Sequence, residues 1–522
     1  MLPTLSNLMP VSPLDAIEPR LRPFLPADLY AAAWVDPSPT MLERVFEHLR
    51  TLHRILIDYS SRQVSEAEIR PGKLRCDKSW RTGTLMFTDL AGFTKLMEAN
   101  ANQGKSGAAS LLKVINAYFT DMLEIISKSG GDLLEFTGDA LLVLFPQDEK
   151  RNDTLLAVRA GLRMQRAMKR FAEIETPAGT LKLEMRVGLH TGRFITASIG
   201  TPHRMENILL GKAVQQAKLA EGSGVNTRVC LSETAYQRVS NVDWLHIEDG
   251  KPGYKLVIDD LTDDQLGEYE LTTRRRMASS VLFDRSVSGL MSEITQTLQS
   301  IEKLACFLPP PVLNLLVESA AARQIPPDFP TPTVMFVNFL GLPEAMDLAL
   351  PGEEGKVANC FSRTFAAINA AVEKHGGVLK KITYHLSGSD IVIYFGVPTA
   401  HTNDSIRAAR AALSIRDIIA NVKPPTVGNV IPEITCQIGI SSGPAFAAEI
   451  GDPRGRREFN VLGDTINTAA RLMSRATSSQ VLVTGAVYEA IREEFTCDSL
   501  GSVSLKGKAD PTPIYALTGP AA

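Results

Sequence analysis

The sequence predicts an α+β fold that is built twice, in two tandem units. An apolar run in residues 84–94, TLMFTDLAGFT, is interrupted by Asp89 and is followed by a stretch with helical periodicity. Residues 129–146, SGGDLLEFTGDALLVLFP, then show two strand-like runs around a Gly-Asp turn. The same order recurs from residue 331 onward, so an internal repeat is visible. A chain of 522 residues is also too long for one ordinary domain.

The composition is that of a globular protein with little charge bias. Hydrophobic residues make up 44%, charged residues 22%, and the net charge is −3, so nothing calls for nucleic acid or an anionic membrane surface as a partner. The six cysteines contain no CxxC pair, and we expect a reduced chain in the cytoplasm. No apolar run approaches the roughly 20 residues that span a bilayer, so no transmembrane segment is expected.

Two segments outside the repeat are predicted to be helical. Residues 1–81 form an N-terminal extension with a helix expected from Thr40 to Asp58, and residues 274–328 form a linker. The apolar positions that recur at helical spacing are Met41, Val45, Leu49, Leu52 and Leu56 in the extension, and Leu290, Met291, Ile294, Leu298 and Ile301 in the linker. We interpret these stripes as packing surfaces; a cap or a dimerising helix is the alternative for the first.

The first unit, residues 82–273, carries a carboxylate at a strand end. Asp89 ends an apolar strand, and Gly92 lets the backbone come close to a ligand before the next helix starts. The N–H groups of Phe93 and Thr94 would face outward at that helix start, where phosphate groups bind. A carboxylate there suits a divalent cation that holds a polyphosphate. Taken alone, the pattern favours an ordinary turn aspartate.

A second carboxylate, Asp139, lies at the tip of the hairpin predicted for residues 129–146. Gly138-Asp139 is a typical tight connection between antiparallel strands. If the hairpin lies beside the strand that ends at Asp89, the two side chains could converge on a pair of metal ions, as phosphoryl-transfer sites require. These two residues are therefore the candidate metal ligands.

The motifs FTDLAGFT, GGDLLEFTGDALLVLF and VGLHTGR resemble the catalytic half of a class III nucleotidyl cyclase. GGDLLEF also has a superficial similarity to the GGDEF box of diguanylate cyclases. That box needs two adjacent acidic residues after the glycines, whereas Leu133 follows Asp132 here. The resemblance implies two ferredoxin-like βαββαβ units, each a mainly antiparallel sheet backed by helices, which meet head to tail as an intrachain pseudo-heterodimer.

The resemblance assigns metal binding to the first unit. It implies two Mg²⁺ (or Mn²⁺) ions on Asp89 and Asp139, with the carbonyl group of Leu90 as a further ligand. The second unit, residues 329–522, has Asn338 at the position that Asp89 holds in the first. The second unit is therefore not expected to hold the metal pair.

The second unit keeps what the first has lost. In NVLGDTINTAAR, Asn467 and Arg471 stand at the family's positions for orienting the ribose and for meeting the charge that develops at the α-phosphate. Their i, i+4 spacing puts both on one helix face. Gln215 and Leu219 occupy these places in the first unit, and Leu219 cannot bind phosphate. The resemblance therefore implies one composite site between the units.

The resemblance also implies contacts to the base. Lys381 would donate to adenine N1, and Asn460 would accept from the exocyclic amine. Lys380 is adjacent, and only one of two neighbouring strand residues is expected to point inward. Lys381 is chosen because it stands in the register of the family's base-reading lysine in GGxxxK; two exposed strand lysines are the alternative. This pair favours ATP as substrate, with GTP as the minor alternative because an amide can flip.

Two further cations are assigned by their place in the family pattern. Arg193, at the end of HTGR, would contact the triphosphate. Lys508, in LKGKADP, would contact the terminal phosphate, and Lys506 competes with it for that role. A solvated surface side chain is the alternative interpretation of each.

Within class III, the tandem units are most similar to the catalytic region of soluble adenylyl cyclases. The implied reaction converts ATP to 3′,5′-cyclic AMP and pyrophosphate for intracellular signalling. Glu135 stands where bicarbonate-responsive relatives carry a lysine, and Leu219 where they carry an arginine, so a response to bicarbonate is not expected. The alternatives are a guanylyl cyclase and a catalytically silent nucleotide-binding protein with a regulatory role.

Overall fold

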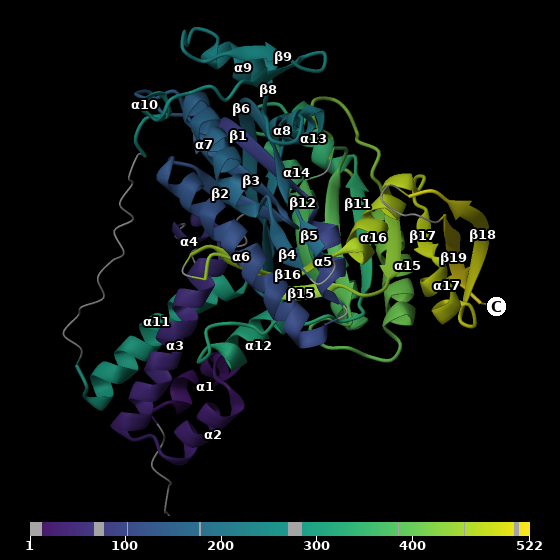
Figure 1. Ribbon diagram of the computed structural model, residues 1–522. Helices are drawn as coiled ribbons and strands as arrows, with labels where there is room; N and C mark the ends of the chain where they lie inside the picture. Colours follow the sequence, from purple (N-terminus) through teal and green to yellow (C-terminus); the bar gives the residue numbers. More distant parts are fainter. Residues whose placement is uncertain are drawn as a thin grey trace, which may run out of the picture. The chain divides into compact units, whose positions relative to one another are not determined.

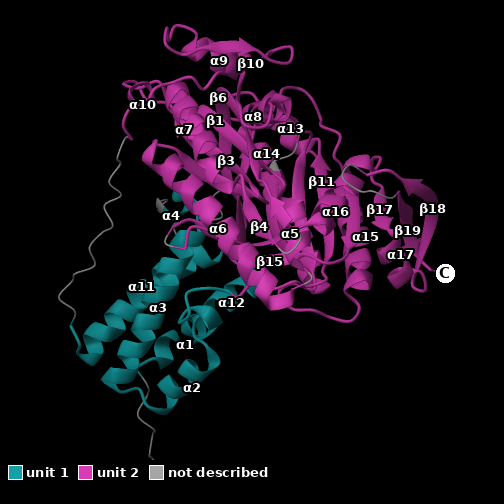
Figure 2. Ribbon diagram, in the orientation of Figure 1, with its two compact units in different colours: residues 1–71, 273–325 teal, residues 72–272, 326–522 magenta. Residues whose placement is uncertain are grey.

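The computed structural model describes residues 13–66, 78–101, 103–176, 179–269, 284–384, 386–453, 455–505 and 511–521. The chain divides into two compact units, residues 1–71 with 273–325 and residues 72–272 with 326–522 (Figure 2). The N-terminal extension and the linker thus contribute to one unit, and both halves of the repeat to the other.

The unit formed by residues 1–71 and 273–325 is helical. It is built around a pair of long helices, α3 (Pro39–Tyr59) and α11 (Val287–Ala305) (Figure 1). Ser38 and Ser286 cap these helices, each accepting a hydrogen bond from a backbone N–H in the first turn. The shorter helices are α1 (Glu18–Leu21), α2 (Ala27–Val35), α4 (Arg62–Glu66) and α12 (Pro310–Ser319). Most of the predicted apolar stripe is buried, namely Val45, Leu49, Leu52, Leu56, Leu290, Ile294, Leu298 and Ile301. Both stripes therefore pack inside this unit.

The unit formed by residues 72–272 and 326–522 contains two large sheets with equivalent strand orders, one in each half of the repeat. The first half has the order β2-β3-β1-β6-β8-β10-β9, with β7 paired to β6, and the second half has β12-β13-β11-β14-β17-β19-β18. The pairs β6–β8 and β14–β17 are parallel, and the neighbouring pairs are antiparallel. The predicted duplicated α+β fold, with mainly antiparallel sheets, is confirmed.

The strands of the first half are β1 (Lys78–Ala91), β2 (Asp132–Thr137), β3 (Ala140–Pro146), β4 (Ile174–Thr176), β5 (Gly179–Leu181), β6 (Glu184–Thr201), β7 (Arg204–Leu210), β8 (Val229–Ser232), β9 (Ile247–Asp249) and β10 (Tyr254–Val257). Its helices are α5 (Phe93–Ala101), α6 (Gly104–Lys128), α7 (Asp153–Ala167), α8 (Lys212–Ser223), α9 (Glu233–Val239) and α10 (Asp263–Leu266).

The strands of the second half are β11 (Thr333–Leu340), β12 (Val378–Tyr384), β13 (Ser389–Phe395), β14 (Thr435–Ser442), β15 (Phe446–Gly451), β16 (Arg457–Leu462), β17 (Val481–Thr484), β18 (Phe495–Val503) and β19 (Thr512–Pro520). Its helices are α13 (Leu342–Leu348), α14 (Glu354–Lys374), α15 (Asp404–Ala420), α16 (Asp464–Arg475) and α17 (Gly485–Ile491).

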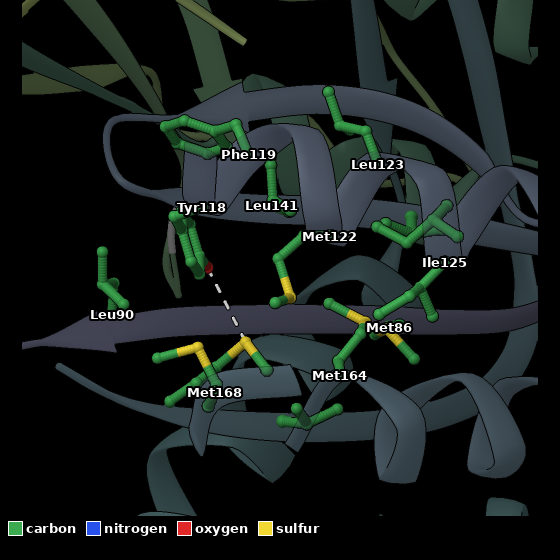
Figure 3. Packing of buried hydrophobic residues seen from close by; sticks show 14 of the residues in the cluster. Met86, Leu90, Tyr118, Phe119, Met122, Leu123, Ile125, Leu141, Met164 and Met168 are labelled. Atoms are coloured by element: carbon green, nitrogen blue, oxygen red, sulfur yellow. Dashed lines mark hydrogen bonds between the residues drawn. The ribbon is translucent and has the colours of Figure 1, made fainter. Parts of the chain in front are cut away.

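The core of the first half lies between β1 and α6. Met86 and Leu90 of β1 belong to one buried cluster with Tyr118 and Met122 of α6 (Figure 3). Successive residues of a strand point to opposite faces of the sheet. Asp89, next to Leu90, therefore lies on the face of β1 that is turned away from α6.

Each half of the repeat contributes a two-stranded ribbon to the core of the other half. Ile195 and Ile208 of the β6–β7 ribbon are buried in the core of the second half. Phe446 and Ile450 of the β15–β16 ribbon are buried in the core of the first half. The two halves therefore share their cores, as a pseudo-dimer within one chain would.

Equivalent hydrogen bonds hold the two ribbons. Gly200 at the end of the first ribbon donates its N–H to Ser362 Oγ on α14 (2.9 Å). Gly451 at the end of the second ribbon donates its N–H to Asn116 Oδ1 on α6 (3.2 Å). The relation between the halves is thus reciprocal, and it brings the start of α16 to the edge of the first sheet.

Candidate active site

Asp89 lies near the end of β1, just before the chain turns into α5. This turn requires glycine, because Gly92 has a φ of +98° and a Cβ there would lie 2.5 Å from a backbone carbonyl oxygen. Leu90 and Phe93 are buried, whereas Asp89 and Thr94 are partly exposed. The Asp89 carboxylate is therefore accessible next to the first turn of a helix.

Asp139 occupies the predicted hairpin tip. Thr137 pairs with Ala140 across a two-residue turn, and Gly138 has a φ of +72°, which suits that turn. Burial, followed by the negative charge of Asp89, raises the pKa of Asp139 to about 7. The sheet therefore brings the two candidate metal ligands close enough to repel each other, which a bound cation would relieve.

This donor set fits the expected metal. Carboxylate and carbonyl oxygens are the ligands that Mg²⁺ and Mn²⁺ prefer. No group of three or more His, Cys, Asp or Glu side chains in the described part of the chain could hold a metal ion. Asp89 and Asp139 would therefore share their ions with water and substrate oxygens, as a phosphoryl-transfer site does.

Arg186 is a site residue that the sequence analysis missed. It is the cross-strand neighbour of Asp89 between β1 and β6, and its Nη2 atom donates to Asp89 Oδ2 (2.5 Å). Its Nε atom lies 2.8 Å from Glu221 Oε1 on α8. A guanidinium therefore stands directly beside the candidate metal ligand. The strand register, which the motif VGLHTGR alone does not reveal, was the missing signal.

The structure does not bring Arg193 to this end of the sheet. Arg193 pairs with Thr82, seven residues before Asp89 along β1, and this separation is about 23 Å at the usual rise of a strand. Its guanidinium stacks over Trp80, 3.9 Å from the ring centre. The predicted triphosphate contact of Arg193 is thus not supported, because antiparallel pairing sends the end of HTGR away from the carboxylates.

The second half meets these carboxylates at the start of α16. A Cβ at Gly463, before the first residue of α16, would lie 2.7 Å from the sulfur of Met97 on α5, and a Cβ at Gly138 would lie 3.9 Å from Leu462. Asn467, one turn further along α16, is exposed. The helix that carries the predicted catalytic residues thus starts against the half that contains Asp89 and Asp139.

Arg471 lies on the same face of α16 as Asn467 and is partly exposed. Its Nη1 atom is 3.7 Å from Asp464 Oδ1 and has no hydrogen-bond partner within the described ranges. A guanidinium nitrogen without an acceptor is costly unless a ligand supplies one. This side chain is therefore available to an incoming anion.

Both adjacent lysines reach the same carboxylate, contrary to the expectation that only one would point inward. Glu458 Oε1 lies 2.7 Å from Lys380 Nζ and 3.2 Å from Lys381 Nζ. The register of β12 shifts between Leu379 and Lys381, which marks a β-bulge that breaks the simple alternation. Lys381 also donates to the carbonyl oxygen of Phe136, so its side chain bridges the two halves.

Asn460 lies on β16 and is 2% exposed. Its Nδ2 atom has no hydrogen-bond partner among the residues that the structure describes. Nδ2 is a donor and cannot accept from the adenine amine, so the predicted contact requires the amide to turn its carbonyl oxygen toward the base. Lys508 and its competitor Lys506 lie outside the described residues.

In the second half, an amide pair stands where the first half has Asp89 and Arg186. Asn338 faces Gln437 across β11 and β14, as Asp89 faces Arg186 in the first half, and Asn338 Nδ2 donates to Gln437 Oε1 (3.2 Å). An amide pair thus replaces the carboxylate and the guanidinium. On the facing helix α8, Gln215 donates to the carbonyl oxygen of Leu386. One carboxylate, Asp390, remains as the cross-strand neighbour of Asn338 on β13.

Comparison with known proteins agrees with this geometry. The model of the adenylate and guanylate cyclase catalytic domain matches the chain twice, over residues 77–252 and 330–519. The chain belongs to this family. It is similar to rat adenylate cyclase type 10, with 24% identity over 449 residues that cover 84% of this chain and 26% of that protein. The chain thus spans about a quarter of the length of that relative.

Two further similarities concern bacterial proteins. An adenylate cyclase of Mycobacterium tuberculosis is 30% identical over 203 residues, which cover 37% of this chain and 43% of that protein. A class III adenylyl cyclase-like ATP-binding protein from Pseudomonas aeruginosa has a solved structure that matches with a TM-score of 0.53 and 14% identity, over 86% of this chain and 93% of that one. The latter similarity shows a shared fold. In the described part of this chain, no helix is both long and apolar enough to cross a membrane.

Proposed function

We propose that this chain is an adenylyl cyclase with one composite active site between its two halves. The observation that supports this proposal most directly is how the polar groups are divided: the first half supplies Asp89 and Asp139, and the second half supplies Asn467 and Arg471. The reaction is attack of the ribose 3′-oxygen on the α-phosphorus of ATP. The bond to the β-phosphate breaks, pyrophosphate leaves, and the 3′-hydroxyl proton passes to solvent or to a phosphate oxygen.

The first half would hold the metal ions and the phosphates. Asp89, Asp139 and the carbonyl group of Leu90 would bind two Mg²⁺ or Mn²⁺ ions, which would acidify the 3′-hydroxyl and neutralise the phosphates. Arg186, which neutralises Asp89 in the absence of metal, would then be free to contact the triphosphate. The N–H groups at the start of α5, Phe93 and Thr94, would bind phosphate oxygens.

The second half would orient the nucleotide and stabilise the transition state. Asn467 would hold the ribose so that its 3′-oxygen is in line with the leaving pyrophosphate. Arg471 would meet the charge that develops at the α-phosphate. Lys381 and Asn460 would contact the adenine edge, the first as a donor to N1. We retain Lys508 as a candidate contact to the terminal phosphate. We no longer assign a triphosphate contact to Arg193.

One assay tests the proposal directly. The purified chain is incubated with ATP or GTP and with Mg²⁺ or Mn²⁺, and the products are identified by mass spectrometry. Cyclic AMP and pyrophosphate in equal amounts are expected. An excess of cyclic GMP over cyclic AMP would favour a guanylyl cyclase. Tight nucleotide binding without any cyclic product would favour a catalytically silent nucleotide-binding protein.

Lys381→Glu is expected to depress turnover of ATP at least tenfold more than turnover of GTP. The new carboxylate opposes adenine N1 and can accept from the N–H groups of guanine, and one charged hydrogen bond is worth roughly tenfold or more. The measurement is kcat/KM for each nucleotide in the wild type and the variant. Since Lys380 is close to the same carboxylate, Lys380→Glu serves as the comparison. An unchanged ATP/GTP ratio would contradict the role of Lys381.

Turnover is expected to be insensitive to bicarbonate. Glu135 adds a negative charge and Leu219 removes a positive one from the pocket where an anion would bind, so both replacements oppose anion binding. The measurement is turnover against bicarbonate concentration at fixed pH and ionic strength, with chloride as the control anion. A saturable increase with bicarbonate alone would mean that other residues hold the anion.

We also propose a cytoplasmic location. The described cysteines are all free thiols. ATP as substrate is available in that compartment, where cysteines stay reduced.

A further inference from the structure

Glu135 is the least well paired carboxylate of a buried charge cluster between the two halves. It lies on β2, and its side chain is 16% exposed. Its Oε1 atom has no hydrogen-bond partner within the described part of the chain. A buried carboxylate oxygen without a donor is unfavourable, and such groups persist where function requires them.

Charges from four elements face Glu135, namely Lys381 on β12, Glu458 on β16, Glu206 on β7 and Lys218 on α8. The other two carboxylates have close partners: Glu458 lies 2.7 Å from Lys380, and Glu206 lies 2.8 Å from Arg204. Within the described residues, Glu135 pairs with Lys381 at 4.0 Å, and Lys218 faces it at longer range. Unlike Glu458 and Glu206, the Glu135 carboxylate therefore has no close cationic partner within the described residues that would weaken its attraction to Lys381.

The two residues stand at equivalent places in their hairpins. The register of β2 shifts between Leu133 and Glu135, and that of β12 shifts between Leu379 and Lys381. A bulge redirects the side chain beside it. A bulge in each hairpin therefore turns Glu135 of the first half and Lys381 of the second half toward one another.

Lys381 has three N–H donors, and two of them are used. One donates to the carbonyl oxygen of Phe136, and one to Glu458 Oε1 (3.2 Å). The third can serve either Glu135 or the adenine N1 of a bound nucleotide. The carboxylate and the base would thus compete for one donor.

We propose that Glu135 is a positioning residue for Lys381, which draws the third N–H toward the first half in the empty site and must release it when adenine binds. This inference rests on the proposed function, since it takes Lys381 as the residue that contacts the base.

The competition depends on the protonation of Glu135. Burial, with Glu458 and Glu206 in addition, raises the pKa of Glu135 to about 7, although Lys381 acts in the opposite direction. Below this pH Glu135 is neutral and leaves the N–H group free for adenine. Above this pH it is ionised and competes. Guanine N1 carries a hydrogen and cannot accept from the freed donor, so guanine gains less from it than adenine does. The preference for adenine over guanine should therefore fall as pH rises.

The test uses nucleotides that bind but cannot react. The dissociation constants of 3′-deoxy-ATP and 3′-deoxy-GTP, each with Mg²⁺, are measured by calorimetry with the full chain at about pH 6 and pH 8. Because both probes share the triphosphate, titration of Asp139 cancels in their ratio. In the wild type, the ratio of the two dissociation constants that favours 3′-deoxy-ATP should fall roughly three- to tenfold from pH 6 to pH 8. This is the change in affinity that one hydrogen bond ordinarily contributes.

Glu135→Gln imitates the neutral form and should keep the low-pH preference at both pH values. Glu135→Met, of similar volume, should do the same if the amide disturbs folding. The matched control is Asp121→Asn, which removes a carboxylate of the same half from a surface pair with Arg170 and should follow the wild type. A preference that is independent of pH in the wild type, or equally pH-dependent in both Glu135 variants, would overturn the inference. Failure of both probes to bind would instead refute the proposed function.

Discussion

Asp89→Ala and Asp139→Ala are each expected to lower metal-dependent cyclase turnover by at least 10³-fold. Each change removes half of the carboxylate pair on which the metal ions would be held, and both ions are needed to bind the phosphates and to acidify the 3′-hydroxyl. The measurement is formation of cyclic AMP with Mg²⁺ and with Mn²⁺. Asp121→Asn is the control for loss of a carboxylate elsewhere in the first half. Retained Mg²⁺-dependent turnover in either alanine variant would refute the metal assignment.

The same pair predicts a stability effect that separates a metal site from a structural one. Asp139 has a raised pKa in the folded chain, so its ionised form is disfavoured there, and its contribution to stability falls as the pH rises toward about 7. Asp139→Asn should therefore unfold at the same or a higher temperature than the wild type at pH 8 without metal. A marked drop in melting temperature would indicate that the carboxylate holds the fold together.

Arg471→Ala is expected to lower turnover by roughly 10²- to 10³-fold, as loss of a preorganised transition-state charge typically does. Its Nη1 atom has no acceptor in the described part of the chain, so little folding stability should be lost with it. The measurement is kcat with saturating ATP, together with the melting temperature. Leu219→Ala, at the equivalent place on α8, is the matched control and should cost little turnover.

A mixing experiment tests whether the site lies within one chain. Full-length Asp89→Ala and Arg471→Ala chains are combined in equal amounts. No activity should return, because each composite site would contain residues of a single chain. Whole chains are required, since each half buries a ribbon of the other, for example Phe446 in the first core and Ile195 in the second. Recovery of activity in the mixture would show that sites form between chains.

Several features were open to prediction from the sequence because their causes are local. Asp89 and Asp139 each mark the end of an apolar run beside a glycine turn, and such turns follow from neighbouring residues. Asn467 and Arg471 are four residues apart, and helical geometry alone puts them on one face. The repeat itself gave the duplicated fold, because two similar sequences form the same sheet.

Tertiary structure decided the rest, because strand register and bulges depend on segments far apart in the chain. The motif ending at Arg193 resembled a phosphate site, but antiparallel pairing with β1 puts Arg186 beside Asp89 instead. Simple alternation predicted one inward lysine, but a bulge in β12 turns both Lys380 and Lys381 to Glu458. The closeness of Glu135 to Lys381 arises only when the two halves pack together, since these residues are 4.0 Å apart in space but belong to different sheets.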